Sequence, residues 1–213
     1  MTAQEYLRTK LTDLKKPIGL EKPKGNEELI EAIYRLLLSK KFRKYSATEQ
    51  LQEHIKSAIR LNVGNQQPIN LTFTQGAYKL WRLEEAPEAD WAELFAAMHY
   101  TRWLNPICQI YKPGVWLDFF VDDLILPKLN DISLEESNAY RQSFQDVIDY
   151  LKRFQPSNLQ MTITGVGDQF ESPEAFYAKL DEDTKRFAKN FPTGLPEPTE
   201  ENIAMIELNA KPN

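Results

Sequence analysis

The sequence has very few residues that bind metals or form disulfides. It contains one cysteine, Cys108, and two histidines, His54 and His99. A single thiol cannot form an internal disulfide, and these three side chains cannot assemble the usual zinc ligand sets. This scarcity excludes a disulfide-stabilised scaffold and a structural zinc. A reducing, cytoplasmic location fits this composition. We expect no redox cofactor and assign no metal ligands.

Long apolar runs and excess positive charge are also missing. No window approaches the roughly 18 to 20 apolar residues of a bilayer span, and residues 1–20 lack the apolar block of a signal peptide. The net charge of −5 gives no overall attraction for a phosphate backbone, although residues 40–44 form a short basic stretch. We expect neither a membrane nor a nucleic acid as partner. The oligomeric state stays open.

The composition that remains is that of an ordinary globular protein. Hydrophobic residues make up 42% and charged residues 27% of the 213 positions, enough for one substantial core. Residues 1–25 mix lysine, proline and glycine without sustained periodicity, which predicts a flexible N-terminal arm with at most one helical turn. The sequence predicts a single α/β domain over residues 26–213.

Hydrophobic periodicity predicts helices that alternate with strands. Capping residues mark several helix starts, among them the pairs Ser46 with Glu49 and Ser133 with Glu136. The expected helices cover residues 26–37, 46–61, 90–105, 133–154 and 172–191, and the expected strands cover 68–75, 115–121, 159–166 and a short last one at 203–208. This order predicts a Rossmann-like three-layer sandwich, with a largely parallel sheet covered on both faces and an N-terminal helical segment.

Polar residues and glycines follow each of the three main strands. Ligands of parallel sheets bind beyond the carboxyl ends of the strands, so we expect a small-molecule site there. The candidates are Gln75, Gly76 and Lys79 after the first strand, Asp122 and Asp123 after the second, and Gly165, Gly167 and Asp168 after the third.

The adjacent carboxylates allow more than one interpretation. Asp122 and Asp123 suit a general base or a Mg²⁺ ligand pair, and equally a loop carboxylate that caps backbone amides beside a solvated neighbour. Residues 165–168 have the outline of a phosphate loop but lack its third glycine and its lysine, so an ordinary turn is favoured. A metal-dependent phosphate-ester hydrolase using these aspartates with Asp168 stays open, as does a non-catalytic binding or interaction module.

The order of several short motifs resembles a known family. They are Gln67-Pro68-Ile69 at the first strand, Lys79, the segment PEADWAEL at 87–94, Tyr111-Lys112-Pro113-Gly114, Asp122, and Tyr140-Arg141. Over about residues 28–155 this arrangement is similar to the N-terminal core of the isocyanide (isonitrile) synthases, which include pyoverdine and dityrosine biosynthesis proteins of secondary metabolism. One departure is that an aspartate, Asp123, stands where the family has a glycine.

The resemblance implies a chemistry and a set of residue roles. Family members build an isocyanide on the amino group of an amino acid and take the carbon from a pentulose phosphate. In this chain the resemblance implies Asp122 as the acid/base group, with Lys79 and Arg82 as phosphate or carboxylate binders. Tyr78, Trp81 and Tyr111 would line the amino-acid pocket. Because of the departures, a shortened or diverged relative is the form expected.

Overall fold

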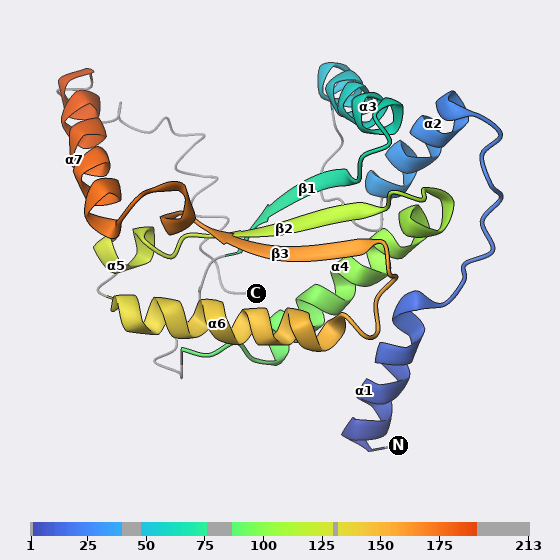
Figure 1. The fold of residues 1–213 in the computed structure, drawn as a ribbon, viewed down its shortest axis with the longest axis horizontal. Helices are drawn as coiled ribbons and strands as arrows, with labels where there is room; N and C mark the ends of the chain where they lie inside the picture. Colours follow the sequence, from blue (N-terminus) through green and yellow to red (C-terminus); the bar gives the residue numbers. More distant parts are fainter. Residues whose placement is uncertain (1, 40–47, 76–86, 130–131, 191–213) are drawn as a thin grey trace, which may run out of the picture. The chain divides into compact units, whose positions relative to one another are not determined.

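A computed structural model of the chain describes residues 2–39, 48–75, 87–129 and 132–190. The chain divides into two compact units, Met1–Gln169 and Phe170–Asn213. The first unit is an α/β structure around an open, all-parallel sheet of three strands, β1 (Ile69–Thr74), β2 (Val115–Val121) and β3 (Leu159–Gly165), in the order β1-β2-β3. Figure 1 shows the strands side by side, with β2 in the middle. The α/β class and the three strand positions predicted from the sequence are confirmed.

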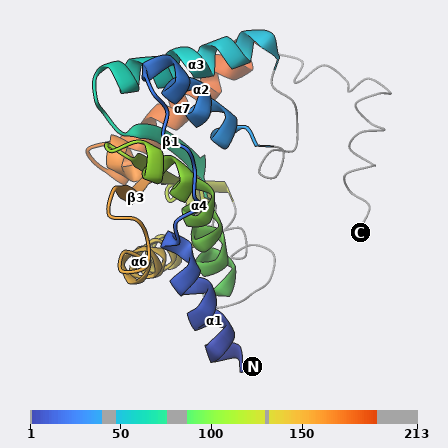
Figure 2. The same ribbon diagram turned by 90° about the vertical axis from the view of Figure 1, so that its right-hand side faces the viewer.

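The two long crossover helices cover one face of the sheet. Alternate residues of β2, Val115, Leu117 and Phe119, are fully buried, as the two-residue period of a strand requires. Figures 1 and 2 show helices α4 (Trp91–Ile110) and α6 (Leu134–Leu151) on the same side of the strands. Asp90 caps α4 and Ser133 caps α6, each in a reciprocal capping box, so both predicted helix starts are confirmed.

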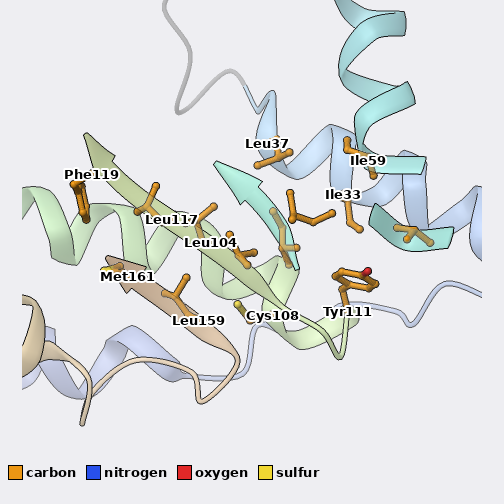
Figure 3. Packing of buried hydrophobic residues seen from close by; sticks show 14 of the residues in the cluster. Ile33, Leu37, Ile59, Leu104, Cys108, Tyr111, Leu117, Phe119, Leu159 and Met161 are labelled. Atoms are coloured by element: carbon orange, nitrogen blue, oxygen red, sulfur yellow. The ribbon is translucent and has the colours of Figure 1, made fainter. Parts of the chain in front are cut away.

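Helices α2 (Asn26–Leu37) and α3 (Glu49–Gly64) extend the same hydrophobic core. Figure 3 shows Ile33, Leu37 and Ile59 from these helices beside side chains of α4 and of the strands. The start of α3 differs from the prediction. Thr48, whose hydroxyl accepts the Leu51 amide, is the N-cap, while Ser46 lies outside the described residues.

The N-terminal segment is more ordered than the predicted arm. Residues Ala3–Thr12 form α1, and Asp13–Lys15 add a short 3-10 helix. Leu11 and Leu14 are each 3% exposed and pack with side chains of α4 and α6, namely Ala97, Met98 and Leu151. Two apolar residues one turn apart are sufficient to hold so short a helix once a tertiary surface is available, because packing supplies most of the stability of short helices.

The other face of the sheet carries polar side chains. Trp116 is 42% exposed, and its indole N–H donates to the Thr162 hydroxyl at 2.8 Å. The hydroxyls of Thr162 and Thr164 donate to the Asp118 carboxylate at 2.6 and 2.9 Å. The predicted second covering layer is not confirmed among the described residues. That prediction followed from the apolar run of β2 and gave little weight to the threonines of β3.

The second unit contains α7 (Pro173–Asn190), which begins at the predicted Ser172-Pro173 pair. The Ser172 hydroxyl accepts the Ala175 amide at 3.2 Å, and the rings of Phe170 and Phe176 meet edge to face at 5.2 Å. The strand predicted at 203–208 lies outside the described residues. None of the helices described is both long enough and apolar enough to cross a bilayer.

Candidate functional site

The carboxyl ends of the three strands bring several predicted residues together. Beyond β1 the Gln75 amide donates to the Phe120 carbonyl at 2.8 Å, and beyond β3 the Val166 amide donates to the Val121 carbonyl at 3.1 Å. These bonds continue the parallel pairing past the last sheet residues. Gln75, Asp122 and Gly165 therefore lie on neighbouring strand ends at one edge of the sheet, as predicted.

Asp123 is buried and is held by hydrogen bonds from neighbouring elements. Its side chain is 7% exposed, one oxygen accepts the Gly167 amide at 3.0 Å, and the other accepts Arg141 Nη1 at 3.0 Å. Its backbone carbonyl accepts the Ser137 hydroxyl at 2.9 Å. These groups of Asp123 thus join the end of β2 to α6 and to the turn after β3. This is the backbone-capping role that the sequence left open for one of the two aspartates.

Arg141 holds a second carboxylate, Asp168, through Nη2. Asp168 Oδ2 also accepts the Gly165 amide at 2.8 Å, which closes an ordinary turn over residues 165–168. Burial works to raise the pKa of Asp168, but the hydrogen bonds from Arg141 and from the Gly165 amide lower it below its ordinary value. Asp168 was predicted to bind substrate. In the structure its carboxylate closes a turn and forms an ion pair with Arg141.

Asp122 differs from its neighbour. Its backbone carbonyl accepts the amides of Ile125 and Leu126, which starts the short helix α5 (Ile125–Leu129). Its side-chain atom Oδ1 is buried and has no hydrogen-bond partner among the described residues. Burial raises the pKa of Asp122, the negative charge of Asp123 raises it further, and only its own backbone amide acts in the opposite direction. A buried oxygen without a partner costs about 1 to 3 kcal/mol, and this cost makes Asp122 a candidate for a functional role.

Replacing Asp122 with asparagine is expected to change the pH dependence of stability. Because the native pKa is raised, the native state binds this proton more tightly than the unfolded chain does. The wild-type free energy of unfolding therefore falls as the pH rises from the ordinary carboxyl range through the raised native value, and the loss is complete above it. An asparagine side chain stays neutral and avoids this loss, so D122N should exceed wild type by about 1 kcal/mol at neutral pH and match it in acid.

Urea denaturation of both proteins across the acid-to-neutral range measures this difference. The exposed carboxyl of Glu135 supplies the control, since E135Q removes one negative charge without changing the strand ends. A D122N protein that is clearly less stable than wild type at neutral pH would mean that Asp122 is a paired structural carboxylate.

A buried polar cluster lies at the end of β1. Tyr140 of α6 is 2% exposed, and its hydroxyl donates to Glu93 Oε1 at 3.3 Å and accepts from Gln75 Nε2 at 3.4 Å. Glu93 itself is 7% exposed, and its other oxygen accepts the Asp90 amide at 2.8 Å. Burial raises the pKa of Tyr140 and the charges of Glu93 and Asp122 raise it further, whereas Gln75 lowers it. The phenol therefore stays neutral beside the carboxylates.

The structure separates Tyr111 from this edge of the sheet. It lies before β2, at the amino ends of the strands, and its hydroxyl donates to the backbone carbonyls of Gln67 and Asn62 at 2.6 and 3.1 Å. Figure 3 shows Tyr111 and Phe119 at opposite ends of the core cluster. Tyr111 and Asp122 therefore lie at opposite ends of β2, and the Tyr111 hydroxyl is bonded to the backbone that precedes β1.

The other predicted residues belong to a part of the chain that the structure does not describe. Gly76, Tyr78, Lys79, Trp81 and Arg82 all lie outside the described residues. For the metal hypothesis, the part of the chain that the structure describes contains no group of three histidine, cysteine, aspartate or glutamate residues arranged to hold an ion.

Comparisons of the chain with family models, with curated proteins and with solved structures find no match. The site itself is therefore the basis for a function.

Three residues of the site have roles that could not be assigned from the sequence. Glu93 was part of the segment PEADWAEL, and Tyr140 and Arg141 were part of a motif, but none of them was predicted to contact the strand ends. A signal was present for Glu93, since a glutamate three residues after the N-cap Asp90 folds back onto the cap and is held at the helix end. Its burial depends on α6, which lies far along the sequence.

Proposed function

We propose that this chain is a diverged isocyanide-synthase-like protein, which acts on the amino group of an amino acid with a pentulose phosphate as carbon source. Asp122 is its acid/base group. The observation that carries the proposal is the buried carboxylate oxygen of Asp122 at the end of the central strand, which has no partner in the part of the chain that the structure describes. Carboxyls with raised pKa values and unused hydrogen-bonding capacity occur preferentially at functional sites.

The chemistry suits such a group. Imine formation and carbon–carbon cleavage each require a proton to be removed and returned, and a carboxyl performs both steps best when its pKa is moved towards neutrality. Burial and the Asp123 charge move the Asp122 pKa in that direction. Asp123 and Arg141 then support the site, because the Asp123 side chain next to Asp122 is bonded to Arg141 of α6 and to the Gly167 amide.

Two alternative functions are less well supported. A metal-dependent phosphate-ester hydrolase would need Asp122, Asp123 and Asp168 to share an ion, but Arg141 already occupies the carboxylates of Asp123 and Asp168. A non-catalytic binding or interaction module on the same fold would have no need for the unpartnered oxygen of Asp122.

The proposal also includes a Rossmann-like three-layer sandwich, a cytoplasmic location and independence from a redox cofactor.

The proposed function predicts stabilisation by its substrates. Tyrosine, tryptophan and ribulose 5-phosphate are added singly and together to the purified chain, and the melting temperature is measured. A ligand present at about 100 times its dissociation constant stabilises by roughly 2.7 kcal/mol. We expect a shift with the sugar phosphate that is lost in K79A, and a larger shift when an amino acid is added.

Two variants and two metal ions distinguish the proposed function from its alternatives. D122N should keep the ligand-induced shift and lose roughly 100-fold or more of any isocyanide-forming turnover, while E135Q should keep both. No shift with any of the three compounds would favour the interaction module. A shift with Mg²⁺ or Mn²⁺ alone would favour the hydrolase.

A further inference from the structure

β3 is an outer strand of the sheet, and the middle of its free edge has no described partner. In a parallel ladder the N–H and C=O of one residue point to the same side, and successive residues alternate between the two sides. The Asn158 carbonyl and the Val166 amide both bond to β2, at 3.0 and 3.1 Å. The N–H and C=O groups of Met161 and Ile163 therefore point away from β2, and the structure describes no hydrogen bond for them.

The two ends of this outward-facing row are closed by side chains of the chain itself. At the start, Gln155 Nε2 donates to the Leu159 carbonyl at 2.7 Å, and at the end the Gly165 amide donates to Asp168 Oδ2 at 2.8 Å. Charged residues and prolines commonly protect outer strands from pairing, and β3 has neither between Leu159 and Gly165. The edge is thus closed at both ends and open in the middle.

Gln155 has an acceptor that the fold does not use. Its side chain is 7% exposed, and its Oε1 is buried without a hydrogen-bond partner in the part of the chain that the structure describes. Such an oxygen costs stability. The Nε2 of the same amide bonds to the Leu159 carbonyl as a backbone N–H of a further strand would. A peptide that continues this pairing along β3 can supply the N–H that Oε1 lacks.

Two hollows flank the open edge. One, of about 370 Å³, is lined by Gln155 and by residues 159–162, among others. Figure 1 shows α6 beside the outer strand β3. The second hollow, of about 470 Å³, is lined by Ile163 together with polar side chains of α6, namely Asn138, Arg141, Gln142 and Gln145. Space alongside β3 is therefore available on both parts of the edge, and the side chains of α6 that border it are polar.

The α6 side of the edge is acidic. Gln142 and Gln145 donate to carboxylate oxygens of Asp146 and Asp149 at 3.2 and 3.0 Å, which places these charges beside the second hollow. Lys152 forms an ion pair with Asp149 at 2.6 Å, and none is described for Asp146. The arginine that lines this hollow already bonds two carboxylates. A basic partner is therefore favoured over a second copy of this chain, which would bring its own acidic α6 close.

We propose that the free edge of β3 binds an extended, basic segment of a partner protein as a fourth strand of the sheet. The backbone groups of Met161 and Ile163 provide the main-chain hydrogen bonds, as in other complexes formed by strand addition. Gln155 Oε1 accepts one further N–H, and Asp146 attracts a lysine or arginine side chain on the α6 side. This surface lies along the side of the sheet, whereas Asp122 lies at the end of β2, so the proposal does not depend on the chemistry assigned to Asp122.

Amide hydrogen exchange in the full chain tests whether the edge is open. We expect the Met161 and Ile163 amides to exchange about tenfold or more faster than those of Thr162 and Thr164, which face β2. Equally slow exchange of all four amides would mean that another segment or a second copy already covers the edge, and would overturn the proposal.

A display library of short random peptides then tests the kind of partner. Selection on the full chain should enrich peptides that contain lysine or arginine, and a bound peptide should slow exchange at Met161 and Ile163. I163P removes one outward N–H and keeps the pairing with β2, since proline is tolerated on outer strands, and it should weaken binding about tenfold or more. Q160A is the matched control, because it changes an exposed side chain of β3 and leaves the edge groups in place.

A charge reversal on α6 tests the proposal without altering the strand. D146K should weaken peptide binding about fivefold or more, while E53K, the same change at an exposed position of α3, should have no effect. The absence of any peptide that prefers wild type to I163P would overturn the proposal, as would equal binding by wild type, I163P and D146K. Self-association that I163P abolishes would assign the edge to a second copy and would overturn it as well.

Discussion

Replacing Gly165 with alanine is expected to lower the free energy of unfolding by about 3 kcal/mol and to release Arg141 from Asp123. An alanine Cβ at this position would overlap Asp123 Oδ2 and would lie 2.6 Å from Asp123 Cγ and 2.8 Å from Arg141 Nη1. The Asp123 side chain is 7% exposed and is held on both oxygens, so it has no room to retreat. The glycine is required because a carboxylate fills the space where a side chain would stand.

Urea denaturation of G165A measures the loss, and two other glycines provide matched controls. A Cβ at Gly167 would come no closer than 3.4 Å to Leu124 Cδ1, an ordinary contact, so G167A should be nearly neutral. Gly64 ends α3 with nothing within 4 Å, and G64A should gain about 0.5 kcal/mol from helix propensity. A G165A protein as stable as wild type would contradict the packing described around Asp123.

Replacing Arg141 with methionine is expected to cost about 3 kcal/mol, because it leaves the buried Asp123 carboxylate without its cation. The Gly167 backbone amide would then be the only group described that donates a hydrogen bond to the Asp123 side chain. Asp168 matters less for stability, since its side chain is 42% exposed and water can solvate it when Arg141 is gone. The buried member of the pair therefore determines the cost.

A double-mutant cycle tests this account. If the cost of R141M is that of an uncompensated buried charge, then D123N should recover a large part of it in the R141M background. D168N, which removes the exposed partner, should cost less than about 1 kcal/mol. Additive effects of R141M and D123N would show that the two side chains do not interact in the folded protein.

The strands and most helix starts could be predicted because their signals are local. The apolar run of β2 between Gly114 and Asp122 predicts its bounds, and the reciprocal pair Ser133 and Glu136 predicts the start of α6. Such signals depend on residues within a few positions of one another. The helix α1 was underestimated because Leu11 and Leu14 find their partners on α4 and α6, far along the chain.

The position of the site could be predicted from the sequence, but the role of each residue in it could not. Parallel strands that end in polar residues predict a shared edge, and the structure does bring Gln75, Asp122 and Gly165 there. The sequence could not distinguish Asp122 from Asp123, because the distinction depends on Arg141, which lies 18 positions beyond Asp123. Tyr111 illustrates the opposite difficulty, since an aromatic residue in a family-like motif lies at the amino end of the sheet, bonded to backbone.

The order of the strands also bears on how the chain folds during synthesis. Because the spatial order β1-β2-β3 is the order of the sequence, each strand pairs with the one made just before it. From the moment β2 emerges from the ribosome until β3 follows it, the apolar strand β2 is an open edge, and open apolar edges invite pairing with other chains. The nascent protein is therefore most exposed to aggregation in the interval before β3 emerges and covers that edge.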